Sequence, residues 1–428
     1  MTSKLNSILQ KVIEEVSVPK EKLKEIEENL IIFLEKVNKE LKSKKVQAEV
    51  FIGGSFARKT LIKKDHYDID IFIRFDQKYR DEEISEIVKK ILTNIKRKQI
   101  IQIHGSRDYF QIRISNDLYF EIIPVKKIKN PKEANNITDL SYSHVRYIKS
   151  RIKSEKTLNE IKLAKAFCYA NNCYGAESYI KGFSGYSLEL LIHHYKSFLK
   201  FAKAMTKVNE KLIIDLEKDY KNKSRILLDL NASKIQSPIV LIDPTYKTRN
   251  VLAALSKETF RKFQDACKKF LKRPSIKDFE LEDTDTKKIE MQAGKNGQEF
   301  LLLKIETNRQ EGDIAGSKLL KFNNLLKREL ENFFEIKNAG FRYSGGKTAE
   351  SFFSVKKKKE EISLGPEIKD TENAKKFKKK HKKTFTKNGR LCAKKEIRLT
   401  AKTFFNQWKK KNSKRAREMS ITNIKSLN

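Results

Sequence analysis

The sequence predicts a multidomain α+β protein, and three observations support this class. The chain has 428 residues, more than one hydrophobic core usually organises, so two to four domains are expected. Its apolar residues follow helical spacing in some segments and strand alternation in others. Hydrophobic residues make up 39% of the sequence and aromatic residues 10%, which is enough to build folded cores and excludes a disordered chain.

The first 150 residues predict a mixed α/β domain. Helical spacing of apolar residues runs through residues 4–42 and breaks near Val18-Pro19, so two helices are expected there. Alternating apolar residues and a Gly53-Gly54-Ser55 turn then predict strand, glycine turn with a short helix, and strand. The expected strands cover residues 46–52, 68–73, 100–104, 109–114 and 118–125, and a further helix covers 82–96.

The rest of the chain predicts a helical domain followed by a mixed part. Helical spacing dominates residues 156–206, and a later helix is expected over 257–271. The run 375–395 is rich in Lys and contains Asn388-Gly389, a hairpin-turn dipeptide, so it predicts a basic strand pair.

The charge balance predicts a polyanionic partner. The chain has 93 Lys and Arg against 55 Asp and Glu, a formal net charge of +38 at pH 7. Such an excess is typical of proteins that bind nucleic acid. Aromatic and histidine side chains within the basic run 375–395 favour RNA contact over a merely solvated surface.

The sequence predicts a cytoplasmic protein without membrane association. No apolar stretch approaches the roughly 20 residues of a membrane span, and the first residues lack the apolar core of a signal peptide. The four cysteines show no paired CxxC spacing, so we expect reduced, packed thiols.

The most informative segment joins the glycine turn to two acidic residues. Asp68 and Asp70 are two residues apart on a predicted strand, so both carboxylates project from one face. Adjacent carboxylates repel each other unless cations lie between them, and oxygen ligands suit Mg²⁺. Such a pair can also solvate an edge strand, but the glycine turn just upstream favours a metal site.

A third carboxylate is expected from the strand over residues 118–125. Glu121 lies among apolar neighbours, where a carboxylate is costly unless it is paired or bound to metal. Asp117 is the alternative candidate.

These motifs resemble the DNA polymerase β nucleotidyltransferase superfamily, whose signature is a Gly-Ser turn, a DxD pair and a third carboxylate. Further segments are similar to the archaeal (class I) CCA-adding enzymes, the tRNA nucleotidyltransferases. These are Gly182-Phe183-Ser184-Gly185-Tyr186, Asp243-Pro244 and Arg249-Asn250-Val251. The resemblance covers nearly the whole chain.

The resemblance implies a fold and a domain order. A polymerase-β-like nucleotidyltransferase head with a mixed sheet is expected first, then a helical central domain that binds nucleotide, and then α/β body and tail domains. The implied boundaries are 1–150 for the head, 151–240 for the central domain, 241–298 and 385–428 for the body, and 299–384 for a tRNA-binding tail.

The resemblance also implies an activity, which is addition or repair of the 3′-terminal CCA of tRNA from CTP and ATP with release of pyrophosphate. Two Mg²⁺ ions and the acceptor arm and 3′ end of tRNA are the implied cofactors and partner, and a homodimer is left open. The implied catalytic residues and metal ligands are Asp68, Asp70 and Glu121. The implied nucleotide-binding residues are Ser55 and Arg58 at the triphosphate, His144, Lys165 and Tyr174 near the phosphates or ribose, and Arg249 at the base.

Simpler interpretations of these residues exist without the resemblance. His144 would be a surface histidine, Lys165 a solvated lysine on a helix, Tyr174 a core aromatic residue and Arg249 a helix cap.

Two other functions stay open at this point. A polymerase of the same superfamily that adds adenosines to RNA would share every catalytic residue. An RNA-binding protein that has lost catalysis is the second, because Lys59 stands where the family often has glycine and Glu121 where it has aspartate.

Overall fold

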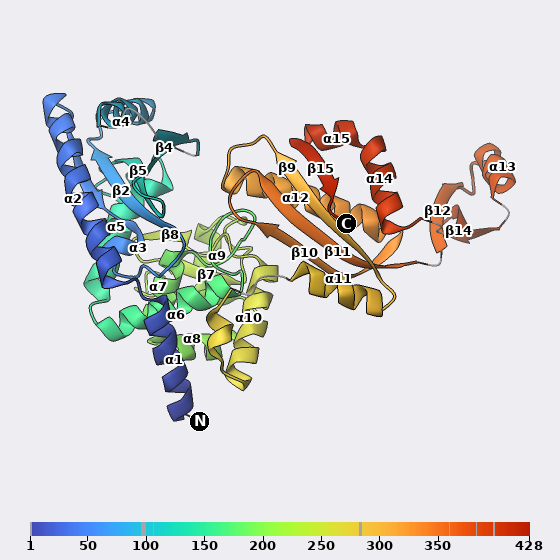
Figure 1. The fold of residues 1–428 in the computed structure, drawn as a ribbon, viewed down its shortest axis with the longest axis horizontal. Helices are drawn as coiled ribbons and strands as arrows, with labels where there is room; N and C mark the ends of the chain where they lie inside the picture. The colour runs from blue at the N-terminus through green and yellow to red at the C-terminus, as the bar shows by residue number, and fades with distance from the viewer. Residues whose placement is uncertain are drawn as a thin grey trace. The chain divides into compact units, whose positions relative to one another are not determined.

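The computed structural model describes residues 2–95, 100–105, 107–281, 285–358, 360–381, 383–396 and 399–428. The chain divides into two compact units, Met1–Glu282 and Asp283–Asn428. Each unit combines helices with sheets (Figure 1), so the predicted α+β class is confirmed. The finer division into head, central, body and tail domains stays a prediction.

The first unit contains a helix-rich half and a sheet-rich half. Its helices are α1 (Thr2–Val16), α2 (Lys20–Ser43), α3 (Gly54–Ala57), α4 (Asp81–Ile95), α5 (Ser141–Arg151), α6 (Glu155–Ala170), α7 (Gly185–Tyr195), α8 (Phe198–Met205), α9 (Lys223–Asp229) and α10 (Lys257–Lys272). Its strands are β1 (Ala48–Ile52), β2 (Tyr67–Phe75), β3 (Ile100–Ile103), β4 (Tyr109–Arg113), β5 (Leu118–Lys126), β6 (Leu212–Ile214), β7 (Ile239–Asp243) and β8 (Tyr246–Asn250). Short 3₁₀ turns cover Pro131–Glu133, Ile137–Leu140 and Ile276–Phe279.

The strands and helices expected before residue 126 are confirmed, with boundaries shifted by a few residues. The predicted break between the first two helices is at Pro19, which is the N-cap of α2. Lys96, the end of the helix expected over 82–96, lies outside the described residues.

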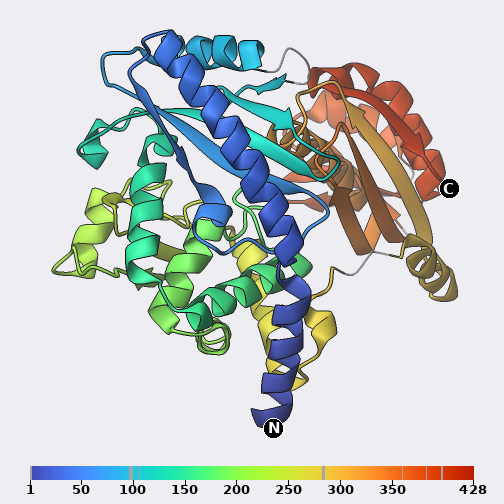
Figure 2. The ribbon, with the colours of Figure 1, turned by 60° about the vertical axis from the view of Figure 1, so that its left-hand side comes forward.

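A five-stranded sheet forms the centre of the N-terminal half, with strand order β1-β2-β5-β4-β3. The pair β2 and β5 is parallel and the other pairs are antiparallel. Helices α2 and α4 share one hydrophobic core with the sheet, and α2 runs across it (Figure 2). Ile69 and Ile71 of β2 belong to this core. Because side chains alternate along a strand, Asp68 and Asp70 point to the opposite face.

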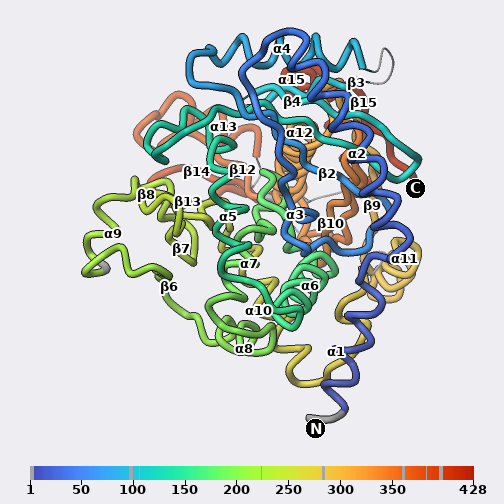
Figure 3. Tube along the Cα trace, turned by 90° about the vertical axis from the view of Figure 1, so that its left-hand side faces the viewer, coloured from blue at the N-terminus to red at the C-terminus, as the bar shows by residue number. Residues whose placement is uncertain are grey.

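The helical half packs around α6 and α7. Its core joins residues of these helices to α1, α5, α8 and α10, and the ring of Phe167 contacts four other phenylalanine rings. Helix α3 lies beside α6 and α7 (Figure 3). A small sheet with the order β6-β7-β8 completes the unit.

The second unit holds two separate sheets. Its helices are α11 (Thr286–Lys295), α12 (Asp313–Glu331), α13 (Thr371–Lys380), α14 (Ala401–Lys411) and α15 (Ser413–Glu418). Its strands are β9 (Glu299–Thr307), β10 (Phe334–Tyr343), β11 (Thr348–Lys357), β12 (Glu360–Glu367), β13 (Thr384–Lys387), β14 (Arg390–Glu396) and β15 (Ile421–Ser426). The larger sheet has the order β10-β11-β9-β15 and shares a core with α12 and α14, and the smaller sheet has the order β12-β14-β13.

The basic run 375–395 is partly a strand pair. The expected hairpin is present as β13 and β14, with the turn at Asn388-Gly389, but the prediction is wrong for residues 375–380, which belong to α13. Asp370 caps this helix by accepting a hydrogen bond from the backbone N–H of Asn373, and Glu372 pairs with Lys376 one turn later. Lys382 lies outside the described residues.

The expectations for the cysteines and for membrane helices can also be compared with the structure. All four cysteines are free and buried, which confirms the predicted packed thiols. Among the described helices, none is long and apolar enough to cross a membrane.

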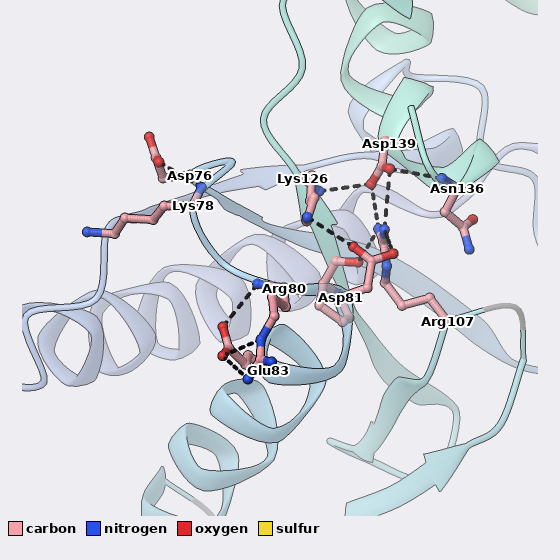
Figure 4. Close-up of polar contacts among 10 residues, drawn as sticks. Asp76, Lys78, Arg80, Asp81, Glu83, Arg107, Lys126, Asn136 and Asp139 are labelled. Atoms are coloured by element: carbon pink, nitrogen blue, oxygen red, sulfur yellow. Dashed lines mark hydrogen bonds and ion pairs between the residues drawn. The ribbon is translucent and has the colours of Figure 1, made fainter. Parts of the chain in front are cut away.

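A buried ion cluster fixes the segment that leaves the five-stranded sheet (Figure 4). Asp139 is 1% exposed and accepts hydrogen bonds from the Arg107 guanidinium and from the backbone N–H groups of Lys126 and Asn136. Arg107 also donates to Asp81 at 2.8 Å. These contacts tie the end of β5 and the turn before α5 to the start of α4.

We expect Asp139→Asn to destabilise the protein by about 3 kcal/mol, because it leaves a buried arginine with only part of its compensating charge. A denaturant titration measures the effect. Glu83→Gln is the control, since it removes the exposed ion pair between Glu83, in the first turn of α4, and Arg80 just before the helix, and it should leave the midpoint unchanged. Equal midpoints for Asp139→Asn and the parent would contradict the role of the cluster.

Candidate active site

The glycine turn is held against the acidic face of β2. Gly54 has a φ of +60°, and a Cβ atom at this position would lie 1.6 Å from Oδ2 of Asp70. The backbone N–H of Gly53 donates to the carbonyl of Asp70 at 2.9 Å. Position 54 therefore requires glycine for its backbone conformation and for the close approach of a carboxylate.

Three predicted acidic residues lie on neighbouring strands. Asp68 and Asp70 belong to β2 and Glu121 to β5, and the parallel register pairs Asp70 with Glu121. All three side chains point away from α2 and α4 because the buried residues alternate with them along both strands. The register thus brings Asp70 and Glu121 side by side, with Asp68 two residues along the strand.

Each of these carboxyl groups has a raised pKa. Burial is the largest cause for Glu121, and the charges of Asp70 and Asp68 add to it, so the pKa of Glu121 is raised to about 8. Loss of hydration also raises the pKa of Asp70, partly offset by the charge of Arg58 and reinforced by Asp68. The pKa of Asp68 is raised by loss of hydration against the charge of Lys64. This site therefore favours a bound cation that would offset the repulsion.

Within the part of the chain that the structure describes, no three His, Cys, Asp or Glu side chains are grouped closely enough to hold a metal ion. The three carboxylates nevertheless supply only oxygen donors on adjacent strands, which is the chemistry that Mg²⁺ prefers. The donor set fits a divalent cation in chemistry and strand register, and the side chains would need to rotate to share one ion.

Asp117, the alternative third carboxylate, is engaged elsewhere. It accepts a hydrogen bond from Nζ of Lys22 on α2 at 2.7 Å and another from Ser115. It precedes β5 and does not line the cavity described next.

A cavity of about 280 Å³ adjoins the acidic face. It is bounded by the glycine turn, β2, α5, α6 and α7. Its lining includes six of the predicted site residues, Ser55, Arg58, Asp70, His144, Lys165 and Tyr174, together with Gly54, Phe72, Ser141, Val145, Gly185 and Tyr186. Asp68, Glu121 and Arg249 are not among the lining residues.

Two cations of the cavity wall share one buried carboxylate. Nζ of Lys165 lies 2.9 Å from Oε1 of Glu189, and Nε of Arg58 lies 2.7 Å from Oε2. The contact between Arg58 and Glu189 is an ion pair and not a hydrogen bond. Nε of Arg58 and Oε2 of Glu189 are both buried and have no hydrogen-bond partner among the described residues. The hydroxyl of Thr60 donates to Glu189 at 2.6 Å and accepts from Lys165 at 2.7 Å. Burial lowers the pKa of Lys165 to about 8, although the charge of Glu189 raises it.

A second buried carboxylate organises the other end of the site. Asp243 is fully buried and contacts Nε2 of His144 at 3.0 Å and the guanidinium of Arg249 at 2.6 Å. It also accepts from the Tyr186 hydroxyl at 3.2 Å, and the Tyr186 ring stacks on His144. Burial raises the pKa of Asp243, but the hydrogen bond and charge of His144 and the charge of Arg249 outweigh it and hold this pKa below its ordinary value.

The structure thus places six of the predicted residues on the cavity wall, Asp68 and Glu121 beside Asp70 in the sheet, and Arg249 on Asp243, which also contacts His144. The simpler interpretations of two residues are wrong, because His144 is 9% exposed and Lys165 is 1% exposed. Glu189 and Asp243 had no predicted role. Their signal was present, since Glu189 lies within an apolar helical run and Asp243 ends an apolar strand, where a carboxylate needs a partner.

Comparison with family models identifies two parts of the chain. Residues 34–140 match the nucleotidyltransferase domain model, and residues 159–280 match the model for the second domain of tRNA nucleotidyltransferase. The first match covers the five-stranded sheet with its acidic face, and the second covers α6, α7 and the strand that carries Asp243.

Curated relatives with similar sequences are CCA-adding enzymes of archaea. The protein of Nanoarchaeum equitans is 42% identical over 212 residues, which cover 50% of this chain and about half, 52%, of that protein. The protein of Methanocaldococcus jannaschii is 29% identical over 91% of this chain and 87% of its own length. The protein of Archaeoglobus fulgidus is 29% identical over 91% of this chain and 86% of its own length.

Solved structures support the fold of the first unit. The Cid1 poly(U) polymerase bound to Mg 3′-dATP has a TM-score of 0.51 and 13% sequence identity, and the match covers 66% of this chain and 100% of that chain. A cytoplasmic RNA terminal U-transferase matches with a TM-score of 0.50 and 12% identity over 66% of this chain and 99% of that chain. With the match to the nucleotidyltransferase domain model, this confirms the predicted polymerase-β-like head.

We expect Glu121→Gln to stabilise the metal-free protein at pH 8 by about 1 to 2 kcal/mol. The pKa of Glu121 is higher in the folded protein than its ordinary value of 4.5, so ionisation opposes folding. This penalty is absent below pH 4.5 and grows until the pH passes about 8. Denaturant titrations in a metal chelator at pH 4.5 and pH 8 test it. If the difference in unfolding free energy between Glu121→Gln and the parent is the same at both pH values, the repulsion is contradicted.

Proposed function

Because the chain belongs to the family of archaeal CCA-adding enzymes, we propose that it adds or repairs the 3′-terminal CCA of tRNA, using CTP and ATP and releasing pyrophosphate. The observation that carries this proposal is the cavity lined by Asp70 together with Arg58 and Lys165. A triphosphate with a bound divalent cation complements this cavity. Its phosphate oxygens would pair with Arg58 and Lys165, and its metal ion would bind the carboxylates.

Asp68, Asp70 and Glu121 would hold the metal, for which we propose two Mg²⁺ ions. When bound, such ions lower the pKa of an attacking hydroxyl and neutralise charge on the phosphates. The residues supply the negative charge that keeps these ions at the acidic face. The backbone carbonyl of Asp70 also holds the glycine turn by accepting a hydrogen bond from the N–H of Gly53 at 2.9 Å.

The cavity wall would bind the rest of the nucleotide. Ser55 and Arg58 follow the glycine turn, and with Lys165 they are placed to bind the phosphates by hydrogen bonds and charge. Tyr174 and His144 also line the cavity and are proposed to contact the phosphates or the ribose. The protein thus contributes position and charge, as is typical of nucleotidyl and phosphoryl transfer.

Arg249 is proposed to help read the base. Its guanidinium is fixed by Asp243, which leaves its other N–H groups with a defined direction. A site with fixed donors discriminates strongly, because a wrong base leaves buried polar groups unpaired.

The basic charge supports tRNA as the partner. Five lysines lie on α13 of the second unit, and β13 and β14 carry further Lys and Arg. Cations on a helix and a hairpin suit the phosphates and 2′-hydroxyls of an A-form acceptor arm, which is recognised by shape.

The proposal predicts an order of nucleotide addition. On a tRNA transcript that lacks CCA, CTP alone should extend the 3′ end by two residues, whereas ATP alone should give no product. On a transcript that ends in CC, ATP alone should add one residue. Gel analysis with single labelled nucleotides measures this, and long adenosine tails from ATP alone would instead indicate a poly(A)-type polymerase.

The proposal also predicts which carboxylates matter. Asp68→Asn, Asp70→Asn and Glu121→Gln should each lower kcat by at least about a hundred-fold, because each removes charge that would hold the metal. Asp117→Asn is the matched control, since Asp117 pairs with Lys22 outside the cavity, and its kcat should stay within about two-fold of the parent. Steady-state CTP incorporation measures the effect, and full activity of Glu121→Gln would contradict the assignment of the third carboxylate.

A further inference from the structure

Glu189 is a buried carboxylate at the cavity for which the proposed chemistry has no direct use. It lies on α7 and is fully buried, and it does not line the cavity. A buried charge is costly unless other charges and hydrogen bonds compensate it. The groups that compensate the charge of Glu189 therefore indicate its role.

The contacts of Glu189 link two parts of the first unit. Arg58 and Thr60 follow α3 next to the five-stranded sheet, whereas Lys165 lies on α6 of the helical half. Glu189 contacts all three with distances of 2.6 to 2.9 Å. Burial alone would raise the pKa of Glu189, but the charges of Arg58 and Lys165 outweigh it and lower this pKa. The carboxylate is thus ionised and holds two cations that would otherwise repel each other.

We propose that Glu189 is a positioning residue for nucleotide binding, because it holds Arg58 and Lys165 together on the cavity wall so that both can act on one triphosphate. This inference rests on the proposed function. Glu189 acts through the two cations and does not itself contact the nucleotide.

The charges around Lys165 show that Glu189 affects the protonation of Lys165 as well as its position. Glu189 favours the protonated form of Lys165, whereas burial and the positive charges of Arg58 and Lys64 favour its neutral form. Asp70 adds a weaker negative charge, and the uncharged Tyr174 hydroxyl lies, like the end of the Lys165 side chain, close to Gly185. Without the charge of Glu189, Lys165 loses its closest favourable partner and gives up its proton at a lower pH.

The test measures CTP binding to the full-length protein with Mg²⁺ and without RNA, so that no turnover occurs. Isothermal titration calorimetry gives the Kd at pH values between 6 and 9. The parent is the reference at each pH, because Glu121, with a pKa of about 8 like Lys165, ionises over the same range in both proteins. In Glu189→Gln the loss of the Lys165 charge should begin at lower pH, so that the Kd at pH 7.5 is at least about ten-fold weaker than that of the parent and the Kd at pH 6 is within about three-fold of the parent.

Two further variants separate positioning from stability. Glu189→Asp keeps the charge but shortens the side chain, and it should restore the pH dependence of the parent with an intermediate Kd. Asp278→Asn removes another buried carboxylate, which pairs with Lys269 and accepts a hydrogen bond from the backbone N–H of Ser275, and which does not line the cavity. It should be destabilised but should bind CTP with the parent's Kd and pH dependence.

Three results would overturn the inference. Glu189→Gln could bind CTP with the Kd and pH dependence of the parent, Asp278→Asn could shift the pH dependence as much as Glu189→Gln, or Glu189→Asp could show the pH dependence of Glu189→Gln. A parent protein that binds no CTP would overturn the proposed function and this inference with it, whereas the other results leave the proposed function intact.

Discussion

The alternation of side chains along β2 is the constraint on which the rest of the site depends. One face of the strand belongs to the core under α2 and α4, so its register cannot slip without exposing isoleucines and burying aspartates. The other face carries Asp68 and Asp70 beside Glu121 of the parallel neighbour β5. The glycine turn then has to approach a carboxylate at a distance that excludes any side chain at Gly54.

Two buried carboxylates organise the wall that faces these acids. Glu189 holds Arg58 and Lys165, and Asp243 holds His144 and Arg249. Each is fully buried, so each interaction is little screened by solvent. The cavity is thus lined by Asp70 of the acidic face and by two cations, Arg58 and Lys165, that are fixed before any ligand arrives, which is the kind of preorganisation that favours a highly charged substrate.

The sequence predicted the elements whose signals are local, and it missed those that depend on distant contacts. The strand with Asp68 and Asp70 and the glycine turn followed from alternation and spacing, and the mixed class followed from periodicity. The nucleotide-side residues came from the family resemblance instead. The pairing of Glu189 with Arg58 joins residues more than a hundred positions apart, so no local pattern could show it. The strand prediction for residues 375–380 rested on the hairpin signal of Asn388-Gly389 and took no account of Asp370, a local helix cap just upstream.

The central claim is that one cavity binds the triphosphate between the acidic face of the sheet and the two cations held by Glu189. A crystal structure of the protein soaked with CTP and Mn²⁺ tests it most directly, because anomalous scattering locates the metal. The account predicts manganese within coordination distance of Asp68 and Asp70 and phosphate oxygens within hydrogen-bond distance of Arg58 and Lys165. Manganese bound away from these aspartates, or a triphosphate that contacts neither cation, would contradict it.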